Sequence, residues 1–228
     1  MQDSWAVIFD WDGVVIDSSA AHQVSWEQLA AEERRALPPD HFERGFGLRG
    51  DKIILDILEW PVDAAEVQRL IARKEELYRA EIRRKGLVLL PGVAGFLDAL
   101  DRLDVPYAVG SSTPRGNIDC ATEMLGLNGR FRAVVAAGDV ANGKPAPDVF
   151  LEAARRLQIA PQRCVVVEDA PAGIEAARRG DMLAVGVTTS HPAERLRAAD
   201  WVVDRLDAIE PEVLRHRIES LSREPRFV

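Results

Sequence analysis

The sequence predicts an α/β fold: a doubly wound parallel sheet into which an α-helical cap domain is inserted. Short apolar runs, typical of strands buried on both faces, alternate with segments whose apolar residues recur every three or four positions, as on amphipathic helices. The alternation breaks once, because residues 17–87 contain almost no strand-like run. Buried strands separated by helices indicate a parallel sheet covered on both faces.

Six apolar runs predict the strands, in chain order Ala6–Phe9, Val105–Val109, Ala133–Ala136, Cys164–Val167, Leu183–Val187 and a weaker Trp201–Val203. Helical patterns between them cover Val93–Leu103, Asn117–Leu125, Pro147–Leu157 and Ala172–Arg179. We therefore assign residues 1–16 and 88–228 to the core domain. Residues 209–228 form a charged, amphipathic tail for which the sequence indicates no purpose.

Residues 17–87 predict the cap domain. Three stretches have helical patterns: AAHQVSWEQLAAEERRAL, DKIILDIL and DAAEVQRLIARKEELYRAEIRRKG, the last ending at Gly86. An insert directly after the first strand lies over that strand's carboxyl end, where open parallel sheets bind ligands. We therefore expect the insert to act as a lid over a site.

The overall charge is acidic, with 29 Lys and Arg against 37 Asp and Glu and a formal net charge of −8. Such a surface repels phosphate backbones, which argues against a general nucleic-acid binder. No run approaches the ~18 consecutive apolar residues of a membrane span, and the N-terminus does not resemble a signal peptide. Two cysteines predict no disulfide framework. We expect a cytoplasmic monomer or weak dimer with no nucleic-acid or membrane partner.

The first strand runs into two carboxylates, in the stretch AVIFDWDGVVID. Because side chains alternate along a strand, Asp10 and Asp12 aim the same way, and Gly13 allows a sharp turn or a close approach to a ligand. Two carboxylates this close repel each other unless a cation or a shared proton holds them. For this motif alone, an acidic turn without chemistry is the alternative.

Three further strands also end in polar groups. Ser111, in GSSTPRGN, is placed to help bind an anion at a helix N-terminus or merely to cap that helix. Lys144 lies in a loop that Pro145 and Pro147 stiffen, although a lone loop lysine is usually solvated. Glu168 and Asp169 follow the fourth strand, and a helix cap is the alternative for Asp169. Together these groups suit Mg²⁺ beside a phosphoryl group.

The segments DWDGVV, Ser111, GKPAPD and EDAPAG resemble, in order and spacing, the four motifs of the haloacid dehalogenase (HAD) superfamily. The resemblance covers essentially the whole chain and is closest to the branch of phosphatases and β-phosphoglucomutase-like proteins with an α-helical C1 cap. It implies a HAD-like Rossmannoid core. It also implies a Mg²⁺-dependent phosphatase that acts on small phosphorylated metabolites, such as sugar phosphates, through an aspartyl phosphate.

The resemblance also implies a role for each matching residue. Asp10 would be the nucleophile, and Asp12 the general acid that later serves as base. Ser111 and Lys144 would hold phosphoryl oxygens. Mg²⁺ would be held by the Asp10 carboxylate, the Asp12 backbone carbonyl and the Asp169 carboxylate, with Glu168 nearby or acting through water. An acid at position 12 favours phosphoryl transfer over carbon–halogen cleavage, since a halide leaves without a proton.

The cap leaves a β-phosphoglucomutase-like phosphomutase as the alternative. His22 matches a histidine of this branch and reads equally well as a helix-surface histidine. Arg49 lies in FGLRGDK, which resembles the substrate-facing loop where mutases carry Ser-Arg-Glu, but this chain has Leu48-Arg49-Gly50-Asp51 there. After Ser111 and Ser112, Pro114 replaces the lysine of the mutases. Both differences from the mutases affect the site for a second phosphate and favour a hydrolase. We expect His22, Arg49 and Ser112 to contact substrate.

Two other classes of protein are weighed against the enzyme. A phospho-aspartate signalling receiver also combines acidic pairs, a hydroxyl and a lysine. Its phosphorylated aspartate, however, lies on a middle strand rather than the first, and it has no helical insert. A non-catalytic binding protein of the same fold is the second. Against it, every residue type that the reaction requires is present.

Overall fold

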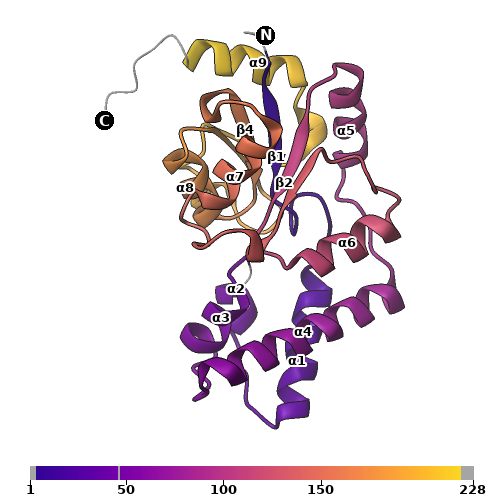
Figure 1. Ribbon diagram of the computed structural model, residues 1–228, viewed down its shortest axis with the longest axis vertical. Helices are drawn as coiled ribbons and strands as arrows, with labels where there is room; N and C mark the ends of the chain where they lie inside the picture. The colour runs from indigo at the N-terminus through magenta and orange to yellow at the C-terminus, as the bar shows by residue number, and fades with distance from the viewer. Residues whose placement is uncertain (1–3, 46, 222–228) are drawn as a thin grey trace.

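The computed structural model describes residues 4–45 and 47–221, which form a body built around a sheet and a smaller helical body (Figure 1). The sheet has six parallel strands in the order β3-β2-β1-β4-β5-β6. Their bounds are β1 Ala6–Phe9, β2 Tyr107–Gly110, β3 Ala133–Val135, β4 Cys164–Glu168, β5 Leu183–Val187 and β6 Trp201–Val203. The predicted fold class is confirmed. The strand expected from Val105 begins two residues later, since Pro106 has no N–H to donate.

Helices cover both faces of the sheet. On one face Val7 and Phe9 of β1 pack into a core with residues of α5, α6 and α9. On the other face Ala6 and Ile8 pack with residues of α7 and α8. The bounds are α5 Val93–Arg102, α6 Arg115–Met124, α7 Asp148–Leu157, α8 Pro171–Arg179 and α9 Pro211–Leu221. This burial on both faces explains why the strands read as unbroken apolar runs.

Part of the C-terminal tail forms α9, which packs against the sheet. Leu214 and Ile218 of this helix are buried in the core of the first face, while its charged residues lie on the outside. The remaining part of the predicted tail, residues 222–228, lies outside the described residues.

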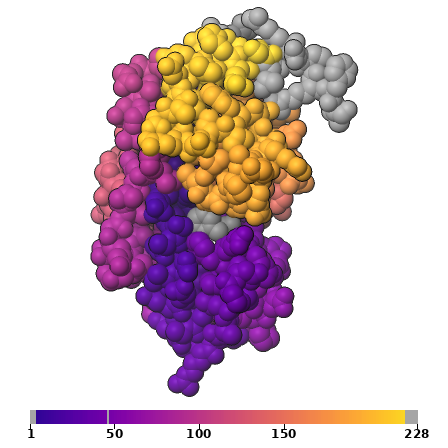
Figure 2. Space-filling model, turned by 180° about the vertical axis from the view of Figure 1, so that it is seen from behind, coloured from indigo at the N-terminus to yellow at the C-terminus, as the bar shows by residue number. Residues whose placement is uncertain are grey.

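The helical body follows β1 and lies beyond the sheet's lower end in the view of Figure 1; Figure 2 shows it from behind. It contains α1 Ser19–Glu33, α2 His41–Gly45, α3 Gly50–Lys52 with a π-helix at Ile53–Ile57, and α4 Ala64–Lys85. It has its own apolar cluster, in which Trp26 and Leu29 of α1 meet Ile54 and Leu70. The segment DKIILDIL, predicted as one helix, is thus part α-helix and part π-helix. Among the described residues, no helix combines the length and apolarity needed to cross a bilayer.

Candidate active site

The sheet brings the predicted strand-end residues together. Phe9 pairs with Val109 of β2 and with Val167 of β4, so the next residue, Asp10, is level with Gly110 and Glu168. Because β2, β1 and β4 are neighbours, Ser111 and Asp169 follow at the same edge.

Trp11, between the two aspartates, is fully buried in the core. Asp10 and Asp12 both line one cavity, as the alternation of side chains predicts.

Lys144 is a buried cation between two carboxylates. Its Nζ lies 2.8 Å from Asp10 Oδ1 and 2.7 Å from Glu168 Oε1, and the Lys144 side chain is only 4% exposed. The Phe150 ring, 4.9 Å from Nζ, adds a cation–π contact. Burial disfavours the ammonium, but Asp10 and Glu168 together raise the pKa of Lys144 above its usual value. The alternative of a solvated loop lysine is therefore wrong.

Both carboxylate oxygens of Glu168 accept hydrogen bonds from the protein. One carboxylate oxygen accepts the Lys144 hydrogen bond, and the other accepts from the backbone N–H groups of Asp169 and Ala170, each at 2.8 Å. A Cβ on Gly173 would lie 1.7 Å from Glu168 Oε1, so only glycine fits beneath this carboxylate. Ala170 is the N-cap residue of α8, and no side chain caps that helix, so Asp169 is not a helix cap.

The acidic residues fit a divalent metal ion. Asp10, Glu168 and Asp169 each offer a carboxylate oxygen, and the three oxygens lie within 4.8 Å of one another. Asp169 Oδ2 is buried without a hydrogen-bond partner among the described residues, and it occupies the place that a Cβ of Gly13 would fill. Burial, with the charges of Glu168 and Asp10, raises the pKa of Asp169 well above its usual value. Three buried carboxylates around one ammonium need further positive charge.

Burial also raises the pKa of Asp10, to about 6, although the Lys144 ammonium works in the opposite direction. Asp12 behaves differently. Burial would raise its pKa, but the His22 ring and the Ser18 and Thr113 hydroxyls lower it to about 2. Ser18 Oγ donates to Asp12 Oδ1 at 2.5 Å, and Thr113 Oγ1 donates to Oδ2. The two aspartates of DWDG therefore occupy distinct environments, as a nucleophile and a proton-transfer group require.

His22 holds Asp12 from the cap side. Its Nε2 lies 3.2 Å from Asp12 Oδ1, and its Nδ1 lies 2.7 Å from Lys74 Nζ. Since an ammonium group only donates, Nδ1 accepts, and Nε2 carries the proton that points to Asp12. The His22 ring also stacks on Tyr78, with centroids 4.1 Å apart. The interpretation of His22 as a surface histidine is therefore wrong.

Lys74 and Glu75 are site residues that sequence reasoning missed. Lys74 is 3% exposed, and its Nζ lies 3.2 Å from Glu75. Asn117 of α6 donates to Glu75 in turn, so this pair joins the cap to the core. The spacing of Leu70, Lys74 and Tyr78 is the signal that would have found the lysine, because it puts a charge on the buried face of an amphipathic helix.

Ser111 is 2% exposed and lies on the cavity wall with Ser112. Its Oγ accepts from Thr113 N at 3.2 Å. Pro114 is the N-cap residue of α6, which no side chain caps, so the helix-cap alternative for these hydroxyl residues is wrong. The Ser111 hydroxyl hydrogen is thus free to point toward a bound anion.

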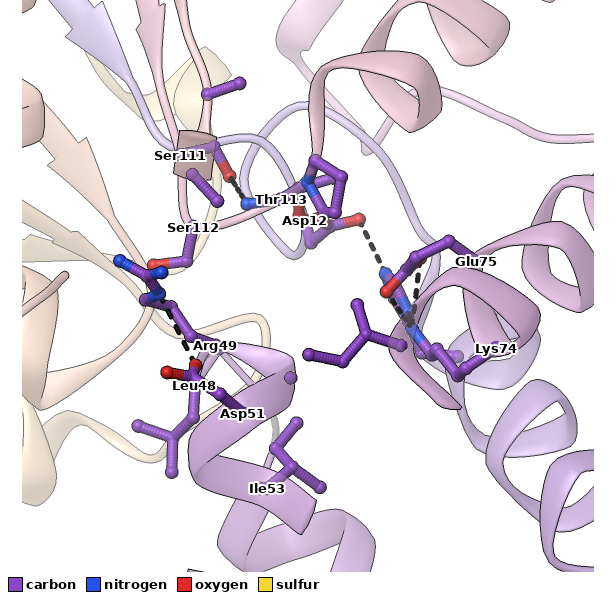
Figure 3. A pocket seen from close by; sticks show the side chains of 18 of the residues that line it. Asp12, Leu48, Arg49, Asp51, Ile53, Lys74, Glu75, Ser111, Ser112 and Thr113 are labelled. Atoms are coloured by element: carbon purple, nitrogen blue, oxygen red, sulfur yellow. Dashed lines mark hydrogen bonds and ion pairs between the residues drawn. The ribbon is translucent and has the colours of Figure 1, made fainter. Parts of the chain in front are cut away.

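The cavity between core and cap has a volume of about 320 Å³, within the usual range for small-molecule sites. Figure 3 shows Ser111, Ser112 and Thr113 on one side of the cavity, Leu48, Arg49, Asp51 and Ile53 of the cap on a second, and Lys74 with Glu75 on a third. Arg49 pairs with Asp51 at 3.4 Å and reaches across to the core at Ala141 O, 3.4 Å away. Arg49, Ser112 and His22 thus border the same cavity as the two aspartates.

Comparisons with known proteins agree with this geometry. A family model for haloacid dehalogenase-like hydrolases matches residues 6–181. The chloroplastic 5-amino-6-(5-phospho-D-ribitylamino)uracil phosphatase of Arabidopsis thaliana is 36% identical over 204 residues, which are 89% of this chain and 54% of that protein. This chain thus spans about half of that relative's length.

Two β-phosphoglucomutases are also similar. That of Bacillus subtilis (strain 168) is 33% identical over 220 residues, covering 94% of this chain and 95% of that protein. The crystal structure of the Clostridium difficile protein superposes with a TM-score of 0.85 at 27% identity, covering 97% of this chain and 100% of the other. The family model, the strand-end motifs and the capped sheet thus agree, and the chain belongs to the haloacid dehalogenase-like hydrolases.

Proposed function

We propose that this protein is a Mg²⁺-dependent phosphatase of small phosphorylated metabolites, such as sugar phosphates, and that it acts through an aspartyl phosphate on Asp10. The observation that carries this proposal is a buried cluster: Asp10, Glu168 and Asp169 lie at the carboxyl ends of the adjacent strands β1 and β4, and Lys144, from the loop before α7, contacts Asp10 and Glu168. Phosphoryl transfer requires a carboxylate nucleophile, a fixed cation and a hard-oxygen metal site; Asp10 lines the cavity, and the cation and the other metal-site carboxylates lie beside it.

In the first step an Asp10 oxygen attacks phosphorus, and the bond to the leaving oxygen breaks. Asp12 donates a proton to the leaving oxygen. In the second step Asp12 takes a proton from water as the water attacks the phosphorus of the aspartyl phosphate, which frees Asp10 and inorganic phosphate. Before substrate binds, Asp12 is in the ionised form that the second step needs, because its pKa is lowered to about 2. The charge of an arriving phosphate favours the protonated form of Asp12 that the first step needs.

Charge is the main obstacle to the attack. At ~4 Å each pair of like unit charges costs about 4 kcal/mol at an effective dielectric of ~20, and a phosphate monoester brings nearly two such charges. Lys144 offsets part of this repulsion, and Ser111 is placed to donate to a phosphoryl oxygen. Mg²⁺, held by Asp10, Asp169 and the Asp12 carbonyl with Glu168 behind them, would supply the remaining positive charge.

Several observations favour a hydrolase over a mutase. A mutase must bind a second phosphate, which needs an unpaired cation at the cap end of the cavity. Among the described residues that line the cavity, each lysine or arginine already has a carboxylate partner: Arg49 with Asp51, Lys74 with Glu75 and Arg115 with Asp139. The Arabidopsis relative is named as a phosphatase, whereas similarity to two β-phosphoglucomutases keeps the mutase as the second candidate.

One assay separates the two candidates. The protein is incubated with Mg²⁺ and a panel of phosphorylated metabolites that includes β-glucose 1-phosphate with a bisphosphate primer. We expect inorganic phosphate to be released from at least one monoester and no glucose 6-phosphate to accumulate. Isomer formation without phosphate release would establish the mutase, and no turnover of any monoester would contradict both.

We also propose, as the sequence predicts, that residues 17–87 act as a cap domain on a core of residues 1–16 and 88–228. The separate apolar cluster of the cap supports this division. A cytoplasmic location and a monomeric or weakly dimeric state belong to the same proposal.

A further inference from the structure

His41 is a buried cap residue that the proposed reaction does not use. It begins α2, is 7% exposed and lines the cavity. Its Nδ1 lies 2.8 Å from the carbonyl oxygen of Pro38. Its Nε2 is buried and has no hydrogen-bond partner among the residues that the structure describes. Buried polar atoms without a partner are rare, so this nitrogen needs an explanation.

The contact with Pro38 determines what Nε2 can bind. A carbonyl oxygen only accepts hydrogen bonds, so the proton of the neutral His41 ring is on Nδ1. Nε2 then carries a lone pair and is an acceptor. The natural partner of such a nitrogen in a substrate cavity is an O–H or N–H group of the ligand.

The rest of the cap wall defines the kind of ligand. The wall is largely apolar, with contributions from Trp26, Phe42, Leu48, Ile53 and Ile71. Each lysine or arginine described around the cavity is paired with a carboxylate, so a second anionic group on the ligand would find no unpaired side-chain cation of these types there. The wall therefore suits a neutral group that carries hydroxyls.

We propose that His41 is a specificity-determining residue that accepts a hydrogen bond from a hydroxyl of the substrate's leaving group, so that the enzyme prefers neutral, hydroxylated monophosphates. This inference rests on the proposed phosphatase function. It assigns to α2 a role in choosing the substrate and none in the phosphoryl transfer itself.

A matched pair of substrates tests the role. D-ribitol 5-phosphate carries hydroxyls along a five-carbon chain, and n-pentyl phosphate has the same chain length without them. We expect wild-type kcat/KM to be at least about tenfold higher for D-ribitol 5-phosphate, which is the usual effect of one neutral hydrogen bond. Equal kcat/KM values for the two would overturn the proposal.

Two substitutions separate the role in specificity from a role in folding. Asn in His41→Asn can still donate to Pro38 O in place of Nδ1 but has nothing at the position of Nε2. We expect about a tenfold loss of kcat/KM for D-ribitol 5-phosphate and less than a twofold change for n-pentyl phosphate. His41→Gln puts an amide near the Nε2 position and should recover part of the preference. The exposed His216 provides the control His216→Asn, which should change neither value.

The outcomes distinguish this inference from the function on which it rests. Equal losses for both substrates in His41→Asn, or no loss for either, would overturn the role of His41 while phosphatase activity stands. If the wild-type enzyme hydrolyses no monoester of the metabolite panel, or if Asp10→Asn leaves hydrolysis intact, the proposed function fails and this inference with it. Hydrolysis of other monoesters but of neither substrate of this pair would overturn the role of His41 alone. Thermal unfolding of each variant shows whether a uniform loss reflects misfolding.

Discussion

The two ends of the cavity differ in how firmly their charges are held. At the sheet end, Lys144 meets Asp10 and Glu168 at 2.8 and 2.7 Å, and all three side chains are less than a tenth exposed. At the cap end, Arg49 and Asp51 are 3.4 Å apart and about a third exposed. Breaking a buried ion pair is strongly destabilising, whereas an exposed pair contributes ~0–1 kcal/mol.

This difference indicates a division of labour. Asp10 and Glu168 are tied to the hydrogen-bonded sheet, and Lys144, from the loop before α7, is buried between them, so these groups are held in one geometry. The cap loop can vary its charged residues at little cost to stability, because they lie near solvent. We therefore propose that the sheet carries the reaction chemistry and that the cap chooses the substrate. The following predictions test this division, from the largest expected effect to the smallest.

Asp10→Asn should have the largest effect on catalysis. The amide cannot form the aspartyl phosphate, so we expect kcat to fall by about 10⁴-fold or more, measured as phosphate released from phenyl phosphate. Asp17→Asn is the matched control: this aspartate of the same segment is exposed and should be replaceable with less than a twofold change. Turnover by Asp10→Asn within a hundredfold of the wild type would exclude Asp10 as the nucleophile.

Asp12→Ala should produce a smaller loss that depends on the leaving group. A general acid contributes about 10²–10⁴-fold when the leaving oxygen needs a proton. We expect such a loss for alkyl phosphates and a much smaller one for p-nitrophenyl phosphate, whose leaving group departs as a stable anion. The measurement is kcat/KM against leaving-group pKa for both proteins. Parallel lines for the two would mean that Asp12 does not donate the proton.

The pKa of Asp10 predicts how pH affects the stability of the metal-free protein. Because burial raises this pKa from 3.8 to about 6, the folded state keeps a proton that the unfolded chain has already lost between these values. The free energy of unfolding should therefore fall as the pH rises from about 4 to about 6, by about 3 kcal/mol. Urea denaturation with EDTA at several pH values measures this fall.

Asp10→Asn should reduce that fall, to which Asp169 also contributes through its raised pKa. It should leave the metal-free protein more stable at pH 7 while it removes activity. Asp12 acts in the opposite direction. Its pKa is lowered to about 2, so the stability it contributes is present above about pH 4 and is lost as the pH falls toward 2. Identical stability profiles for wild type and Asp10→Asn would argue against a buried, destabilising charge at Asp10.

Arg49→Ala should have the smallest effect. The partly exposed guanidinium contacts Asp51 and the Ala141 carbonyl oxygen only at 3.4 Å, so we expect a two- to fivefold rise in KM for the metabolite substrate, little change in kcat, and no change in KM for a small aryl phosphate. Arg44→Ala, another exposed arginine of the cap, provides the control. If Arg49→Ala lowered kcat a hundredfold, the cap would share in the chemistry, and the division of labour would be wrong.

The sequence alone determined the sheet and the acidic end of the site. Buried strands are continuous apolar runs, so the residue at which each run ends can be read directly, and parallel strands bring those ends to one edge. Asp10, Ser111 and Asp169 follow from this local pattern, and Lys144 from the loop with Pro145 and Pro147 after the third run. The predicted ends of the helices and strands were less accurate than their existence, because prolines and caps set where each element begins and ends.

Only the tertiary structure decided how the cap meets the core. Lys74 reaches His22 over 52 residues of chain, and Asn117 reaches Glu75 over 42. His41 is buried by its surroundings, although nothing in the run PPDHFERG marks it as a core residue. Such contacts join residues that are distant in sequence, and they depend on how two separately packed bodies dock. No periodicity within a single helix or strand encodes that docking, which is why the sequence predicts the chemistry of this protein better than its choice of substrate.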